Sequence, residues 1–228
     1  MADKITQLEK KVGYRFRDKS FLQTAVTHSS YANEVKKGSA NNERQEFLGD
    51  AVLSIVVSDY LFKRFHLAEG DLTKLRASLV CEKSLCGFAG QIGLGDYLLL
   101  GKGEEMTGGA QRPSILADAF ESVIAAIYLD GGIERAADFV LPFVTAQLDS
   151  EQGQGFRDYK TMLQEIVQQN PEESVSYVLV DESGPDHDKR FQVEVHLNSN
   201  VIGRGAGRSK KAAEQMAAKE ALELMGEG

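Results

Sequence analysis

The chain has 228 residues, of which 42% are hydrophobic, and a formal net charge of −8. This length allows one large domain or two small ones. The acidic balance argues weakly against a nucleic-acid-binding protein, although the placement of charges matters more than their sum. Acidic residues or glycine interrupt every apolar run within about a dozen residues, so no transmembrane helix is expected. The amphipathic start is not typical of a signal peptide, and Cys81 and Cys86 form neither a disulfide framework nor a zinc motif. We therefore expect a cytoplasmic protein.

Residues 1–150 have the apolar periodicity of a helical domain, with glycines and prolines between the segments. The predicted helices cover residues 4–12, 19–27, 43–65, 71–80, 83–92, 114–129 and 132–149. Residues 151–157 follow, with two glycines and no apolar period. This composition predicts a flexible linker.

Residues 158–228 change in character. The pattern predicts a short helix, three alternating strands and a second helix, at 158–170, 174–182, 191–197, 200–207 and 209–225. The order α-β-β-β-α in about 70 residues is typical of a small α+β domain.

The helix predicted at 43–65 carries three carboxylates on one face. At about 100° per residue, Glu43, Glu46 and Asp50 fall within an arc of about 60°. A solvated face is the ordinary interpretation of such a row. The rest of this helix is apolar on its other sides, which predicts burial, and a buried Asp50 must be paired or bind a metal.

The helix predicted at 114–129 repeats this feature, with Asp118 and Glu121 as its only charges. Two buried helices that each bring unpaired acids can share a hard cation, and oxygen ligands suit Mg²⁺ or Mn²⁺. A di-iron bundle would need a histidine three residues after a glutamate, and none of the four histidines has this spacing. A histidine–aspartate phosphohydrolase site at His187 is disfavoured because no other histidine lies close to it in the sequence.

The second domain concentrates positive charge at one helix start. Lys210 and Lys211 lie in the first turn of the last predicted helix, with Arg204 and Arg208 just before it. Cations oppose the helix dipole at this end, so their presence indicates a bound phosphate that the backbone N–H groups also contact. The nearby glycines do not form a nucleotide-binding loop, because the spacing GxxxxGK[ST] is absent.

Several motifs, in the right order, now identify a family resemblance. ERQEFLGDAVL resembles the signature of the bacterial ribonuclease III family, which usually reads ERLEFLGDAVL. GGAQRPSILADAFESVIAAIYLDGG resembles the family's second acidic motif, and HLAEGDLTKLRASLV resembles the segment between the two. The tail resembles the family's double-stranded-RNA-binding domain. The resemblance implies an all-α catalytic and dimerisation domain at 1–150 and an α+β RNA-binding domain at 158–228.

The resemblance also implies an activity: a Mg²⁺-dependent endoribonuclease, for which Mn²⁺ can substitute, that cuts double-stranded RNA and leaves 5′-phosphate and 3′-hydroxyl ends. The implied substrates include ribosomal-RNA precursors and other structured transcripts. The implied metal-binding catalytic acids are Glu46, Asp50, Asp118 and Glu121, with Glu43 and Glu69 as further acids near the scissile strand. A homodimer is implied, because one acidic centre cuts one strand. Where the family usually has leucine, this chain has Gln45, which would complete a capping box with Asn42.

In the second domain, the resemblance assigns duplex contacts to three segments. Such domains span about 16 base pairs and read mainly shape. The implied minor-groove contacts are Thr161, Gln164, Glu165 and Gln168 on the first helix and His187 on the turn. The implied contacts at the last helix are Arg208, Ser209, Lys210 and Lys211, of which the two lysines would bridge major-groove phosphates.

Two other interpretations stay open at this point. An RNA-binding regulator could hold duplex RNA without cutting it, although intact acids at all four metal positions disfavour this. A purely structural helical dimer would leave the unpaired acids and the Lys210–Lys211 helix start unexplained.

Overall fold

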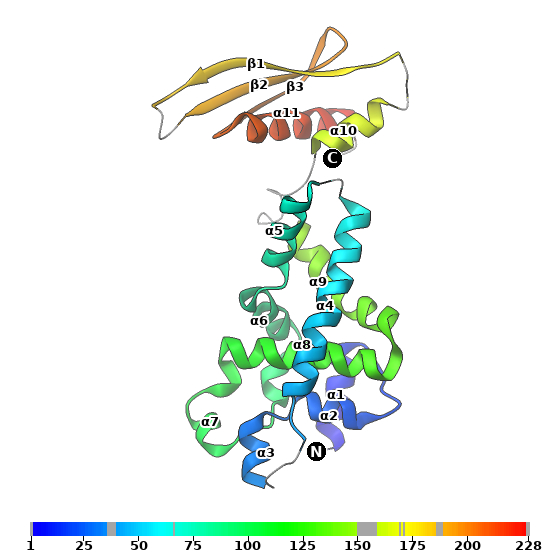
Figure 1. Ribbon diagram of the computed structural model, residues 1–228, viewed down its shortest axis with the longest axis vertical. Helices are drawn as coiled ribbons and strands as arrows, with labels where there is room; N and C mark the ends of the chain where they lie inside the picture. The colour runs from blue at the N-terminus through cyan, green and yellow to red at the C-terminus, as the bar shows by residue number, and fades with distance from the viewer. Residues whose placement is uncertain are drawn as a thin grey trace. The chain divides into compact units, whose positions relative to one another are not determined.

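The structure is a computed structural model that describes residues 2–35, 40–65, 67–149, 159–168, 170, 172–185 and 189–226. The chain divides into two compact units, Met1–Phe156 and Arg157–Gly228 (Figure 1). The first unit is helical and the second combines a three-stranded sheet with two helices, which confirms the predicted fold class. The predicted linker, 151–157, lies outside the described residues. Within the described part of the chain, no helix is long and apolar enough to cross a bilayer.

The first unit contains the seven predicted helices. They are α1 (Ala2–Val12), α2 (Lys19–Ala25), α4 (Glu43–Arg64), α5 (Glu69–Leu79), α6 (Glu82–Gln91), α8 (Pro113–Gly131) and α9 (Ile133–Asp149). Four short elements were not predicted: α3 (Ser29–Val35), α7 (Lys102–Met106), and the 3₁₀ turns η1 (Leu94–Tyr97) and η2 (Gly109–Gln111). None of them is long enough to show a hydrophobic period.

Helix α8 forms the centre of the first unit. Pro113 occupies its first position, where the missing N–H would have had no intrahelical partner. Phe120, in the middle of the helix, is fully buried. Its ring centroid lies 5.8 Å from that of Phe88 on α6 and 5.3 Å from that of Phe139 on α9. This aromatic packing fixes α8, and with it the two acids that the helix carries.

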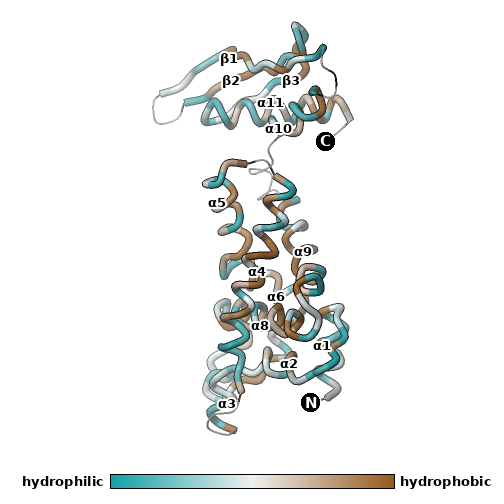
Figure 2. Tube along the Cα trace, turned by 45° about the vertical axis from the view of Figure 1, so that its right-hand side comes forward, coloured by the Kyte–Doolittle hydropathy of each residue, from teal (hydrophilic) through white to brown (hydrophobic). Residues whose placement is uncertain are grey.

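Helix α4 packs along α8, and Gly49 marks their closest approach. A Cβ atom at this position would overlap the backbone carbonyl group of Glu121. Glycine inside a helix costs about 1 kcal/mol relative to alanine, and the close packing offsets this loss. In Figure 2, hydrophobic residues gather along α4. The approach places the first turns of α4 directly beside the middle of α8.

The predicted capping box at the start of α4 is wrong. Asn42 has right-handed helical backbone angles, and its side chain makes no cap hydrogen bond. Its backbone is instead held by an earlier segment of the same chain, since the N–H of Asn42 donates to the carbonyl oxygen of Thr27 at 2.9 Å. Gln45 turns inward and donates from Nε2 to the carbonyl oxygen of Phe21 at 3.2 Å. Its buried Oε1 has no hydrogen-bond partner among the described residues.

The expectation that α4 is buried on all sides is also wrong. Asp50 is exposed, so burial does not force it to find a partner. The helix also leaves three large apolar side chains uncovered, Phe47 (82% exposed), Ile55 (57%) and Phe62 (75%). Large exposed apolar residues on one face are typical of an interaction surface and not of a core.

The second unit has the predicted order of elements. They are α10 (Tyr159–Val167), β1 (Val175–Ser183), β2 (Arg190–Leu197), β3 (Asn200–Gly207) and α11 (Lys210–Met225). The antiparallel sheet has the order β1-β2-β3, and both helices lie on one face of it (Figure 1). Side chains at Gly203, Gly205 or Gly207 would collide with α11. The glycines of β3 are therefore explained by the close packing of α11 on the sheet.

Candidate functional site

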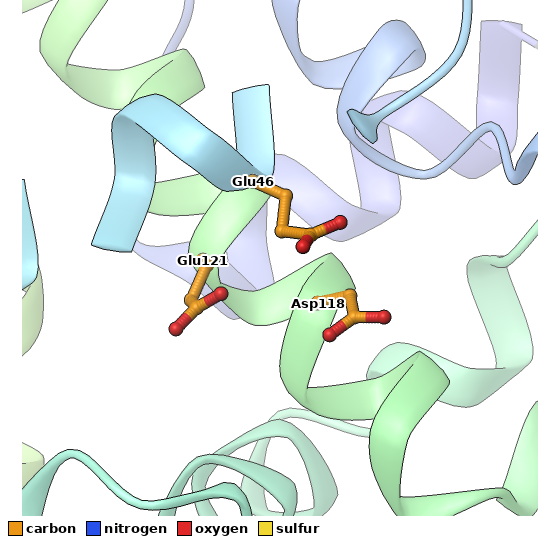
Figure 3. Close-up of side chains that lie close together, drawn as sticks. All are labelled: Glu46, Asp118 and Glu121. Carbon is orange, nitrogen blue, oxygen red and sulfur yellow. The ribbon is translucent and has the colours of Figure 1, made fainter. Parts of the chain in front are cut away.

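Three carboxylates from α4 and α8 converge in the first unit. One carboxylate oxygen from each of Glu46, Asp118 and Glu121 lies within 4.8 Å of the other two. Figure 3 shows the three side chains turned toward a common space, one from α4 and two from α8. We call this group the acidic cluster. It joins residues that the sequence placed on two separate helices.

The acidic cluster holds its negative charge at a cost. Burial, as the largest cause, together with the negative charges of Asp50, Asp118 and Glu46 raises the pKa of Glu121 from 4.5 to about 8. Burial also raises the pKa of Glu46, to which the charges of Asp118 and Glu43 add. Like charges held close together oppose one another's ionisation, so the folded protein gains when a cation joins the cluster.

Asp118 has neighbours of both signs. Its pKa is raised by burial first and then by the charge of Glu82, while the charge of His28 lowers it. Within the described part of the chain, no lysine or arginine forms an ion pair with Asp118, Glu46 or Glu121. The three acids therefore lack the basic partner that a structural ion pair would provide.

A single carbonyl group ties the two acid-bearing helices together. The carbonyl oxygen of Asn42 accepts the N–H of Glu46 at 2.8 Å and the hydroxyl of Ser122 at 3.1 Å. Ser122 is fully buried, and its hydroxyl also lies 2.8 Å from the carbonyl oxygen of Asp118. Together with the contact at Gly49, these bonds set the register between the first turn of α4 and the middle of α8.

The donor set of the acidic cluster fits a hard divalent cation. It contains carboxylate oxygens and no histidine nitrogen or cysteine sulfur, which favours Mg²⁺ or Mn²⁺ over softer metals. The three raised carboxyl pKa values point the same way, because a cation would replace the protons that burial favours.

The other predicted acids lie outside this group of three. Asp50 is exposed one turn after Glu46, near enough to Glu121 for its charge to act there. Glu43 is exposed at the start of α4 and accepts a hydrogen bond from Nδ2 of Asn41 at 3.3 Å. Glu69 is exposed at the start of α5, where the Thr73 hydroxyl donates to it at 3.0 Å. Their roles as ligand or substrate-facing acids stay predictions.

The raised pKa of Glu121 should make the stability of the metal-free protein depend on pH. The folded carboxyl binds its proton more tightly than the unfolded one, so the resulting stability is complete below pH about 4.5 and is lost as pH rises through about 8. Glu121→Gln has no such proton to release. We expect urea unfolding in the presence of a chelator to show a smaller loss of stability from pH 5 to 8 in the variant than in the wild type. Parallel pH profiles of the two proteins would contradict the assignment.

The second unit presents the predicted RNA-binding residues on its surface. On α10, Gln164 and Glu165 are exposed and Thr161 is half-buried, on a face apart from the buried Leu163, and Gln168 is exposed in the turn that follows the helix. The predicted residue His187 lies outside the described residues. The residues at the start of α11, from Arg208 to Lys211, are all exposed. Ser209 is the N-cap, and its side chain accepts the N–H of Ala212 at 3.1 Å.

Sequence reasoning missed the residues that position the acids. Gly49 could have been noticed, because a glycine between apolar residues of a strong helix needs a packing reason. Ser122 is a polar residue inside an apolar run, which is a weaker signal. Nothing in the local sequence showed that its partner would be Asn42, 80 residues away.

Comparison with known proteins agrees with both units. Residues 18–148 match a family model described as ribonuclease-III-like, and residues 159–225 match the double-stranded RNA binding motif. The chain is 52% identical to ribonuclease 3 of Pelotomaculum thermopropionicum, over 96% of this chain and 92% of that protein. It is 50% identical to ribonuclease 3 of Caldanaerobacter subterraneus, over 97% of this chain and 98% of that protein.

A solved structure extends the comparison to three dimensions. The nuclease domain of ribonuclease III from Campylobacter jejuni is 49% identical in sequence. It superposes with a TM-score of 0.58, covering 62% of this chain and 96% of that domain. The fold of the first unit, the motif matched in the second, and the identity over nearly the whole length agree. On these grounds the chain is an endoribonuclease that belongs to the ribonuclease III family.

Proposed function

We propose that the protein is a Mg²⁺-dependent endoribonuclease of the cytoplasm that hydrolyses phosphodiester bonds in double-stranded RNA. It leaves 5′-phosphate and 3′-hydroxyl ends and acts on ribosomal-RNA precursors and other structured transcripts. The observation that carries the proposal is the acidic cluster, three converging carboxylates without a basic partner among the described residues. A matched double-stranded RNA binding motif in the same chain supports the choice of substrate.

In this proposal, the cluster residues Glu46, Asp118 and Glu121 hold the metal, and Asp50 completes the ligand set. When bound, such an ion activates water and neutralises charge on the phosphate. Glu43 and Glu69 lie near the scissile strand. The short ties through Asn42 and Gly49 hold the ligands in place before substrate arrives, which lowers the cost of organising the site.

A cleavage assay tests the proposed activity directly. A labelled RNA duplex and its separated strands are incubated with the protein in Mg²⁺, in Mn²⁺ and in a chelator. We expect cleavage of the duplex only when a divalent ion is present, and end-labelling should detect a 5′-phosphate on the products. Tight binding of the duplex with no cleavage in either metal would favour the alternative, a regulator that holds RNA without cutting it.

The proposed RNA contacts of the second unit predict a salt effect. We expect Lys210→Ala combined with Lys211→Ala to weaken binding of unrelated duplexes to the same extent, because phosphate contacts carry no sequence information. The slope of log affinity against log salt should fall by nearly one unit for each lost contact. Lys219→Ala is the control, since Lys219 lies on the same helix beside Glu223 at 3.7 Å. An unchanged salt slope in the double variant would count against these lysines as phosphate contacts.

We also propose that the first unit forms a homodimer through the open face of α4. Phe47, Ile55 and Phe62 fall within an arc of about 80° on this helix. Ile55 lines two neighbouring grooves of about 620 and 570 Å³, which suit apolar side chains of a second copy. In the Campylobacter jejuni nuclease domain, a flexible region is involved in dimer formation. Two copies would supply one acidic cluster for each RNA strand.

Removal of one exposed ring should separate the dimer without unfolding the chain. Phe47 is 82% exposed in a single chain, so Phe47→Ser removes little from the core of that chain. We expect this variant to shift toward monomer in sedimentation velocity. Met106→Ser is the control, because Met106 is 87% exposed on α7, away from this face. A Phe47→Ser protein that sediments as the wild type does would argue against this interface.

We propose the division of labour that the sequence predicted: residues 1–150 for catalysis and dimerisation, 151–157 as a linker and 158–228 for binding RNA. The separate hydrophobic cores of the two units support this division.

A further inference from the structure

Lys160 lies in the first turn of α10, where a positive charge opposes the helix dipole. The argument that predicts a phosphate at Lys210 on α11 therefore applies to Lys160 as well. The structure gives Lys160 a different partner, because its Nζ lies 2.5 Å from Oε2 of Glu214 on α11. The charge of Lys160 is thus already balanced within the second unit.

Two further contacts hold Lys160 in this position. Its Nζ stands 4.6 Å from the centre of the Tyr177 ring on β1, which is a cation–π contact. Its backbone N–H donates to Oε1 of Gln215 on α11 at 3.3 Å. The side chain is 33% exposed. An ammonium group that is held between an acid and an aromatic ring is a poor candidate for a phosphate contact.

The acid that Lys160 neutralises is a neighbour of Lys210. Glu214 lies one turn after Lys210 on α11, at the i,i+4 spacing at which side chains on a helix meet. Without Lys160, the Glu214 carboxylate would be free to pair with Lys210 and would compete with an RNA phosphate for its ammonium group. In the structure, Lys210 is exposed and forms no ion pair with an acid among the described residues.

A second acid near the start of α11 is neutralised in the same way. Glu182 on β1 pairs with Phe191 on β2, which pairs with Gly207 at the end of β3. This row of the sheet ends three residues before Lys210. A hydrogen bond from Lys189 is the largest cause that lowers the pKa of Glu182, and the charge of Lys210 lowers it too. The Nζ of Lys189 lies 2.9 Å from Oε1 of Glu182.

We propose that Lys160 and Lys189 are positioning residues for RNA binding: each holds an acid beside the start of α11, so that Lys210 stays available to a phosphate. We call these two residues the shielding lysines. This inference rests on the proposed contact between Lys210 and the RNA backbone. It assigns the shielding lysines no contact with RNA of their own. It explains how a unit with more acidic than basic residues presents an open cation to a polyanion.

A second substitution that restores binding separates this role from a direct contact. Lys160→Met keeps an apolar stem over Tyr177 and removes the charge. We expect the affinity for duplex RNA to fall by about three- to fivefold at low salt, because Glu214 then competes for Lys210. Addition of Glu214→Gln to Lys160→Met should restore the affinity, since it removes the competing charge.

The measurement is fluorescence anisotropy of a labelled RNA duplex with the full-length protein in a chelator, at several salt concentrations. The slope of log affinity against log salt should fall by nearly one unit in Lys160→Met and return in the double variant. In duplex cleavage, Lys160→Met should raise KM and leave kcat unchanged, because it affects binding and not the chemical step.

Lys219→Met is the matched control. Lys219 also lies beside an acid, Glu223 at 3.7 Å, and over a tyrosine ring, that of Tyr159 at 6.0 Å. Glu223 lies in the last turn of α11, at the opposite end from Lys210. Lys219→Met should therefore bind the duplex as the wild type does, and a loss equal to that of Lys160→Met would overturn the proposal.

Two other results would also overturn it. One is wild-type affinity in a folded Lys160→Met variant. The other is a double variant as weak as Lys160→Met, because removal of Glu214 repairs neither a lost phosphate contact nor a folding defect. If urea unfolding shows that Lys160→Met does not fold, Lys189→Met decides, since the side chains of Lys189 and Glu182 are 39% and 38% exposed. A loss of affinity that Glu182→Gln restores then supports the proposal, and any other result overturns it.

The outcomes also separate this inference from the proposed function. A wild-type protein that does not bind duplex RNA overturns both. If the combined Lys210→Ala and Lys211→Ala variant binds as the wild type does, the phosphate contact is wrong and this inference falls with it, while metal-dependent cleavage stands. If that variant binds weakly and a folded Lys160→Met variant binds normally, only the role of the shielding lysines is overturned.

Discussion

Glu121→Gln is expected to lower cleavage of duplex RNA by more than about a hundredfold, because groups that merely support a metal ligand already contribute about ten- to a hundredfold. Glutamine keeps the shape of the side chain and removes the charge. A bound cation would stabilise the ionised form of Glu121, whose pKa is raised to about 8 by burial and by the negative charge of three neighbours. The measurement is single-turnover cleavage in Mg²⁺.

Glu121→Gln should still bind duplex RNA, and this result would distinguish a defect in cleavage from a defect in folding. The affinity of Glu121→Gln for the same duplex, measured in a chelator, should match the wild type. Glu105→Gln is the matched control, an exposed glutamate on α7 that should cleave at the wild-type rate. Undiminished turnover of Glu121→Gln in Mg²⁺ would remove Glu121 from the metal centre.

Gly49→Ala should have the second large effect, through the packing of α4 on α8. The added methyl group would occupy the space of the Glu121 carbonyl group, so the two helices must move apart at the acidic cluster. Overpacking of this kind costs about 1–3 kcal/mol, and the separation would also disturb the ligand geometry. We expect lower stability in urea unfolding together with weaker Mn²⁺ binding and slower cleavage.

Gly90→Ala, in the same unit, is expected to change stability in the opposite direction to Gly49→Ala. Gly90 lies in α6 with open space where a Cβ would stand. Alanine is the better helix former by about 1 kcal/mol, so this variant should be more stable than the wild type and cleave normally. Equal effects of the two substitutions would show that helix propensity, and not the contact with Glu121, decides the outcome at Gly49.

The sequence was sufficient to predict the elements that have a long hydrophobic period. It was also sufficient to identify residues whose charge conflicts with their apolar surroundings. Asp118 and Glu121 were recognised as unpaired acids on an apolar helix, and the structure brings them together with Glu46. Helices α3 and α7 were missed because each is too short to show a period.

Features that depend on tertiary contacts could not be predicted locally. Asn42 and Gln45 have the spacing of a capping box, but bonds to Thr27 and Phe21 take precedence over local capping. The exposure of Asp50 was missed because an apolar pattern does not say whether the same chain or another molecule covers it. The same limit hid the contact of Gly49 with Glu121, which exists only once α4 and α8 are packed.

The residues of the acidic cluster lie far apart along the chain, which has a consequence during protein synthesis. Glu46 is made well before Asp118 and Glu121, and the ribosome adds residues from the N-terminus onward. A nascent chain that ends before α8 therefore carries α4 but cannot assemble the acidic cluster. On the ribosome, the chain therefore assembles the acidic cluster only after α8 has emerged and packed against α4.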